Sequence, residues 1–175
     1  MGSNPAATTN KEEKNMRAIN ISRDAMMEFT NNTSYVVISI INPDDPPVRL
    51  KNDPNRVDVL QLAFHDSDRH APGVRLMDHQ QGQELLAFVE KYEPLVDMFV
   101  VHCHAGIARS SAVAAAISLT HLNENDNRFF DNTIRKYDKH PFEEMGTVPN
   151  RWVYRLILNM HDRNLRKKGL IPNEG

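Results

Sequence analysis

The sequence has one cysteine, Cys103, no long apolar run and almost no net charge across its 175 residues. A single cysteine cannot form a disulfide within the chain, which favours a reducing compartment and predicts a cytoplasmic protein. No apolar run approaches the roughly 20 residues that a membrane-spanning helix requires. The formal net charge of −2 gives no overall attraction to nucleic acid or to an anionic membrane. We therefore expect neither as a partner, and we expect a monomer.

Metal-ligand spacing is also lacking. The single cysteine and the eight scattered histidines do not form the paired spacings of a zinc site. His102 and His104 would project to opposite sides of an extended segment. The sequence therefore predicts no metal site and no cofactor.

The length of the chain suits one domain with its own core. Its apolar content of 40% and charged content of 25% are ordinary for a globular protein. Residues 1–15 are polar and lack apolar periodicity, so we expect a disordered leader or a cloning remnant. The domain is expected to span residues 16–168 and to be followed by a tail at 169–175.

Apolar patterns predict strands alternating with helices at first, and helices alone at the end. The expected strands are 35–41, 57–64 and 98–102, with a further apolar run at 18–21 and a brief helix capped by Ser22. The expected longer helices are 78–92, 110–121, 126–137 and 150–164. This order predicts an α/β fold with a mostly parallel central sheet of four to five strands flanked by helices. In such folds ligands bind outside the carboxyl ends of the strands.

Residues 100–118 carry the strongest chemical signal. An apolar strand end leads into a cysteine, five further residues, an arginine and a helix that is apolar nearly all round. A loop between a strand and a helix directs successive backbone N–H groups into one hollow, and the helix N-terminus adds a positive dipole end. This pattern predicts a phosphate site. The residues expected to bind the phosphate are His104, Ala105, Gly106, Ile107, Ala108 and Arg109.

Individual side chains of this stretch suggest a nucleophile and its supports. Cysteines beside a helix N-terminus ionise more readily than a free thiol, so Cys103 is the expected nucleophile. The planar guanidinium of Arg109 can grip two phosphate oxygens. Gly106 supplies the backbone freedom of a tight turn. Ser110 is expected to cap the helix and to donate to the thiolate, and His102 to orient the backbone of Cys103.

These residues resemble the signature His-Cys-x-x-Gly-x-x-Arg-Ser/Thr of the cysteine-dependent protein tyrosine and dual-specificity phosphatases, and every fixed position is filled. The likeness is to compact bacterial or phage members and extends over residues 18–165. The segment 149–155 also looks like a C-terminal segment of those proteins. The resemblance implies a dual-specificity-phosphatase-like fold and hydrolysis of phosphomonoesters through a phosphocysteine, without a metal.

The family's general acid is an aspartate on a loop after the preceding strand, some thirty-odd positions before the cysteine. Two residues match this description: Asp66 stands 37 positions and Asp68 35 positions before Cys103. Asp66 follows the predicted strand more directly, so we prefer it. Asp78 is expected to open a helix instead.

Several readings of the substrate and the activity stay open. The resemblance favours phosphotyrosine, with phosphoserine and phosphothreonine as further candidates. A non-protein phosphate such as a phosphoinositide or a nucleotide is an alternative, although the loop offers no lysine at Ala105, Ile107 or Ala108. A pseudophosphatase that only binds phosphorylated partners would be expected to have a broken signature. A sulfurtransferase of the rhodanese type would not need Gly106, Ser110 or an upstream acid.

Overall fold

The computed structural model describes residue 2, residues 16–121 and residues 149–173. The predicted helix at 126–137 and all but residue 2 of the predicted leader lie outside this part of the chain. Within it, four strands form one parallel sheet in the order β1-β4-β2-β3. Their bounds are β1 Arg17–Ser22, β2 Tyr35–Ile41, β3 Arg56–Ala63 and β4 Met98–Cys103. The predicted α/β class with a mostly parallel sheet is confirmed.

The two central strands, β2 and β4, are buried along their whole length. Both are runs of mainly β-branched and aromatic residues with no acidic or basic side chain apart from His102, and such runs suit strands that are covered on both faces. The edge strand β3 alternates between exposed and partly buried residues over most of its length. β4 therefore delivers its last residue, Cys103, at the middle of the sheet.

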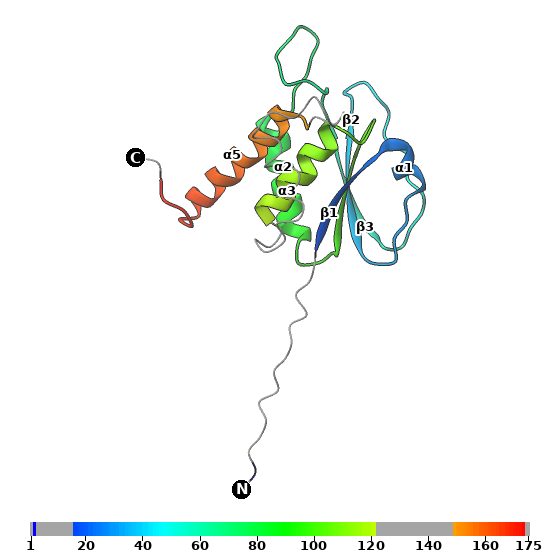
Figure 1. The fold of residues 1–175 in the computed structure, drawn as a ribbon, viewed down its shortest axis with the longest axis horizontal. Helices are drawn as coiled ribbons and strands as arrows, with labels where there is room; N and C mark the ends of the chain where they lie inside the picture. Colours follow the sequence, from blue (N-terminus) through cyan, green and yellow to red (C-terminus); the bar gives the residue numbers. More distant parts are fainter. Residues whose placement is uncertain (1, 3–15, 122–148, 174–175) are drawn as a thin grey trace, which may run out of the picture.

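Three helices cover one face of the sheet, and a short one covers the other (Figure 1). The helices α2 His79–Tyr92, α3 Arg109–His121 and α5 Arg151–Lys167 share the larger core with the sheet. The short helix α1 Arg23–Glu28 packs on the opposite face, over a smaller cluster that includes Met26. As predicted, α3 is buried nearly all round, because it lies between the sheet and α5.

Several element bounds differ from the prediction. The apolar run at 18–21 is the core of an edge strand, β1, which pairs with β4. Helix α3 begins at Arg109, so Ser110 lies inside the helix and does not cap it. Helix α5 extends beyond the predicted end at residue 164 to Lys167, and its last turn is closed by hydrogen bonds from Lys168.

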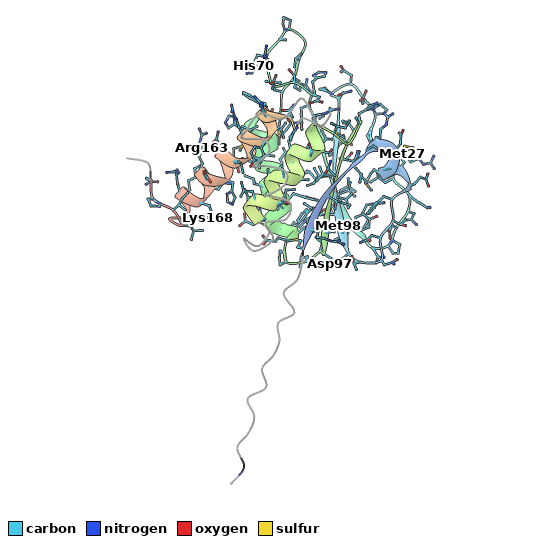
Figure 2. The ribbon with its side chains drawn as sticks, viewed as in Figure 1. Met27, His70, Asp97, Met98, Arg163 and Lys168 are labelled. Atoms are coloured by element: carbon cyan, nitrogen blue, oxygen red, sulfur yellow. The ribbon has the colours of Figure 1, made fainter. Side chains whose placement is uncertain are left out.

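The carboxyl ends of all four strands meet at one edge of the sheet because the strands are parallel. The loop after β3 stands out from this edge, with His70 near its tip (Figure 2). Among the described residues, no helix combines the length and the apolar character that crossing a membrane would demand.

Candidate catalytic site

The loop of residues 104–108, here called the cradle loop, is tied to the end of strand β1. The side-chain Nδ2 of Asn20 donates to the carbonyl oxygen of Gly106 over 2.9 Å. The backbone N–H of Arg23 donates to the carbonyl oxygen of His104 over 3.1 Å. Two loop carbonyls are thereby turned towards β1 and away from the interior of the loop.

Gly106 is required at its position for two reasons. Its φ of +71° lies in the left-handed region, which side chains disfavour. In addition, a Cβ added there would lie 2.5 Å from the backbone carbon of Ile21 and from the backbone nitrogen of Ser22. Because both neighbours are backbone atoms of a sheet strand, they cannot move aside cheaply. The glycine predicted from the signature is therefore needed for close approach as well as for the turn.

Cys103 and Ser110 meet beneath the cradle loop. The Cys103 side chain is 3% exposed, and Ser110 is fully buried. The thiol donates to the Ser110 hydroxyl oxygen over 3.2 Å. In the thiolate form this hydroxyl would be the donor, because a thiolate can only accept. Ser110 thus lies beside the thiol but does not cap the helix, and its expected role of donating to a thiolate stays a prediction.

Arg109 is anchored on one edge of its guanidinium. Its Nη1 donates to Asn42 Oδ1 over 2.9 Å and to the carbonyl oxygen of Phe64 over 2.8 Å. These two acceptors follow strands β2 and β3, so the ends of two strands fix the side chain. Arg109 is 4% exposed, and its Nε is buried without a hydrogen-bond partner in the described part of the chain. A buried guanidinium N–H without a partner is costly and suits a site that receives an anion.

The backbone of the cradle loop offers further donors. No hydrogen bond joins the backbone N–H groups of residues 105–108 to any other residue that the structure describes. Helix α3 begins directly after the loop, and its N-terminus adds a positive dipole end. The loop thus combines free N–H groups, a helix N-terminus and the unpaired Nε of Arg109, which together suit a phosphate-sized oxyanion.

His102 lies behind Cys103 and is fully buried. Neither ring nitrogen makes a hydrogen bond to a described residue, although the backbone of Cys103 lies close enough to favour the protonated ring slightly. Burial dominates and lowers the pKa of His102 from its ordinary 6.5 to about 4, and the nearby charge of Arg23 adds to the shift. The ring is therefore neutral at pH 7. The predicted role of orienting the Cys103 backbone stays a prediction.

Residues 65–75, here called the protruding loop, carry both candidate acids. The loop is closed at its base, where the backbone N–H of His65 donates to the carbonyl oxygen of Arg75 over 2.8 Å. Asp66 is exposed, and its Oδ1 accepts a hydrogen bond of 3.0 Å from Asn150 Nδ2. The backbone N–H of Asn150 donates to the carbonyl oxygen of Ala108 over 2.9 Å. Asn150 thus links Asp66 to the cradle loop through two hydrogen bonds, one from its side chain and one from its backbone.

Asp68 has no such link. It is exposed, and within the described ranges its carboxylate pairs only with Arg69, at 3.7 Å, which is a neighbour in sequence. Surface pairs of this kind contribute little to structure. The contacts therefore favour Asp66 over Asp68 as the side chain held near the cradle loop.

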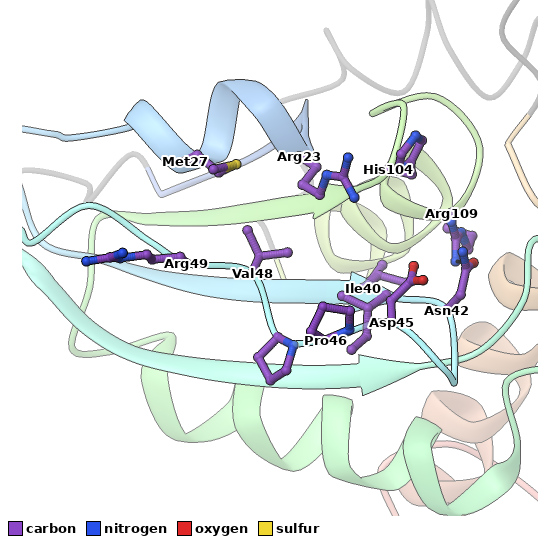
Figure 3. A pocket seen from close by; sticks show the side chains of 12 residues that line it. Arg23, Met27, Ile40, Asn42, Asp45, Pro46, Val48, Arg49, His104 and Arg109 are labelled. Carbon is purple, nitrogen blue, oxygen red and sulfur yellow. Dashed lines mark hydrogen bonds between the residues drawn. The ribbon is translucent and has the colours of Figure 1, made fainter.

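A cavity of about 320 Å³ opens beside the cradle loop, between α1 and the loop after β2. Figure 3 shows the guanidinium of Arg23 and the ring of His104 on the side of the cavity next to Arg109. Apolar side chains, among them Met27 and Val48, line the part farther from the cradle loop. Its size is that of a small-molecule site. Among the residues that the structure describes, no group of three or more histidine, cysteine, aspartate or glutamate side chains could hold a metal ion.

Comparisons with known proteins bear on the fold. No family model and no curated protein matches the chain. Human DUSP28 superposes with a TM-score of 0.52 at 12% identity, and the match covers 86% of this chain and 94% of that one. The chain has the fold of the dual-specificity phosphatases. A mouse putative dual specificity phosphatase, crystallised with zinc tungstate, matches with a TM-score of 0.47 at 16% identity, over 79% of this chain and 77% of that one. At these identities the likeness concerns the fold alone.

Proposed function

We propose that the protein is a phosphatase that hydrolyses phosphomonoesters through a phosphocysteine intermediate. One observation carries this proposal: at the end of the central strand the thiol of Cys103 is hydrogen-bonded to the buried hydroxyl of Ser110, the residue next to Arg109, whose Nε has no partner among the described residues. Phosphotyrosine is the proposed substrate, with phosphoserine and phosphothreonine as further candidates. The adjoining cavity is large enough for the body of such a substrate.

In the first step, the Cys103 thiolate attacks phosphorus, a sulfur–phosphorus bond forms, and the bond from phosphorus to the leaving oxygen breaks. Asp66 gives its proton to that oxygen. In the second step, water attacks the phosphocysteine while Asp66 takes a proton from the water, and the thiolate leaves. The hydroxyl of Ser110 supports the departing thiolate. Charge on the phosphoryl oxygens is met by Arg109 and by the cradle-loop N–H groups.

The test is hydrolysis of two esters, an aryl phosphate with a good leaving group and an alkyl phosphate with a poor one. Cys103→Ser should abolish turnover of both. In Asp66→Asn, kcat/KM, which reports the step that forms the phosphocysteine, should fall about 10²- to 10⁴-fold on the alkyl ester and much less on the aryl ester. Asp68→Asn is the matched control, because it makes the same change two positions away and should leave both rates near wild type.

The outcomes separate the competing readings. Substantial turnover by Cys103→Ser would refute the nucleophile. A wild-type protein that binds vanadate but turns over neither ester would be a phospho-binding module, the pseudophosphatase alternative. If Asp68→Asn alone showed the leaving-group dependence, the acid would be Asp68.

A further inference from the structure

Asn150 lies where three parts of the molecule meet. It is the N-cap of helix α5, and its side-chain Oδ1 accepts the backbone N–H of Val153 over 3.1 Å. Its Nδ2 donates to Asp66 Oδ1 over 3.0 Å and to the carbonyl oxygen of Ser67 over 3.1 Å. Its backbone N–H donates to the carbonyl oxygen of Ala108 over 2.9 Å. One residue therefore joins the cradle loop, the protruding loop and α5.

The orientation of this amide is determined by its surroundings. The backbone N–H of Val153 requires an acceptor, so Oδ1 must face it. Nδ2 then faces the carboxylate of Asp66 and the carbonyl of Ser67, and both of these are acceptors. The opposite orientation would leave three unfavourable contacts. Asn150 is 6% exposed, so water competes little for these hydrogen bonds.

We propose that Asn150 is a positioning residue that holds Asp66 in the geometry of the general acid. The inference rests on the proposed function. Because Nδ2 donates to Oδ1 of Asp66, the acidic proton resides on Oδ2, the oxygen that remains free to donate to a leaving group. The backbone bond from Asn150 to Ala108 fixes the distance between that carboxyl group and the cradle loop. Without the Nδ2 donor, the exposed side chain of Asp66 would sample several rotamers.

Capping and positioning can be separated by substitution. Asn150→Asp keeps an N-cap of about equal strength but replaces the donor to Asp66 with a carboxylate that repels it. Asn150→Ser also keeps a capping oxygen and lacks the donor, without adding charge. Asp78→Asn is the matched control: it makes the reverse exchange at the N-cap of α2, where the side chain accepts the backbone N–H of Gln81.

The experiment compares kcat/KM, which reports the step that forms the phosphocysteine, on an alkyl phosphate and on an activated aryl phosphate. Asn150→Asp should lower kcat/KM on the alkyl ester by about tenfold or more, since misplacing a catalytic group can cost up to about 10²-fold. It should leave kcat/KM on the aryl ester within about twofold, because a good leaving group needs little protonation. Asn150→Ser should show the same pattern, and Asp78→Asn should change neither ester. Thermal unfolding of each variant shows that the helix cap is intact.

A double substitution decides whether Asn150 acts through Asp66. In an Asp66→Asn background, Asn150→Asp should have no further effect on the alkyl ester. If its loss of rate persists there, or is equal on both esters, the positioning role is overturned. If Asn150→Asp unfolds the protein, Asn150→Ser decides between the same outcomes. Failure of the proposed function looks different, because wild-type turnover would then not depend on Cys103 at all.

Discussion

The cradle loop and the protruding loop lie at the same edge of the sheet, yet they are held in different ways. The cradle loop is fixed to strand β1 by Asn20 and to the first residue of α1 by the backbone of Arg23, and only a glycine fits at position 106. In the protruding loop, residues 68–73 are all exposed. This loop is hydrogen-bonded to Asn150 at the N-terminal end of α5, a helix from the other end of the domain. The proposed phosphate site is thus held by the sheet, and the proposed acid, Asp66, is held by a helix that is distant in sequence.

This difference predicts two kinds of kinetic defect. Damage to the cradle loop should affect all substrates alike, because every phosphoryl group must be bound there. Damage to the protruding loop should lower kcat/KM only on substrates with poor leaving groups, because kcat/KM reports the first step. The following variants test that division.

Arg109→Lys should have the largest effect. A lysine keeps the positive charge but loses the planar guanidinium, which binds Asn42 and Phe64 and is proposed to bind the phosphoryl group at the same time. We expect kcat/KM to fall about 10²- to 10³-fold, by the same factor on aryl and alkyl esters. A loss confined to the alkyl ester would contradict the division between the loops.

Acidification should destabilise the protein through the ring behind the cradle loop. Burial lowers the pKa of His102 to about 4, so between pH 6.5 and 4 the unfolded chain binds a proton that the folded chain does not. This contribution to stability is present above pH 6.5, is lost as the pH falls towards 4, and amounts to about 3 kcal/mol at most. Urea unfolding of the wild type and of His102→Gln across this range measures it.

The His102→Gln variant should lose part of this pH dependence and keep the part due to His121. Burial also lowers the pKa of His121 to about 4, in the same direction. Identical pH profiles for the variant and the wild type would show that His102 is already protonated or hydrated in the folded state.

Gly106→Ala and Gly73→Ala compare the two loops directly. Both glycines have a positive φ, +71° and +75°, but a Cβ at Gly73 meets no atom within 4 Å. Gly73→Ala should therefore lower the folding stability by about 1 kcal/mol, the conformational cost of a side chain in the left-handed region. Gly106→Ala should lose clearly more folding stability, because the backbone of Ile21 and Ser22 must also shift. Its activity should fall on both esters. Equal melting temperatures for the two variants would contradict the tight contact with β1.

His70→Ala should have the smallest effect. His70 packs edge-on against Trp152 of α5, with ring centroids 5.3 Å apart, and helps to hold the tip of the protruding loop. Such pairs contribute about 0.5 to 1.5 kcal/mol to stability, so we expect kcat/KM on the alkyl ester to fall by about two- to threefold. The rate on the aryl ester should not change. A larger loss on the aryl ester would mean that the tip contacts the phosphate site.

The sequence predicted the strand–loop–helix unit that carries the candidate nucleophile and arginine, because that unit depends on local order. Cys103, Gly106 and Arg109 lie within one strand–loop–helix unit, so their spacing already determines how they meet. The buried run of β2 and the apolar surface of α3 were predicted for the same reason, since period and composition are local properties. Ser110 was placed correctly beside the thiol but wrongly as a helix cap, because the helix begins one residue earlier than the pattern suggested.

The polar residues that hold the site were not found from the sequence. Asn20, Asn42 and Asn150 make hydrogen bonds to residues 86, 67 and 84 positions away, and nothing local distinguishes them from other loop asparagines. The order of the strands could not be predicted either, because it depends on how the connections between parallel strands cross the sheet. The positions of Asn20 and Asn42 at or next to the carboxyl ends of β1 and β2 are the only signal that could have suggested them.

The most direct test of the account is the capture of the covalent intermediate. Asp66→Asn would be mixed with an activated aryl phosphate, quenched with acid within milliseconds and examined by peptide mass spectrometry. Since this variant lacks the base for the second step, we predict a phosphoryl group on the peptide that contains Cys103, and none after Cys103→Ser is added to the variant. Turnover of the ester without any phosphoryl group on Cys103, or with one on a histidine instead, would contradict the account.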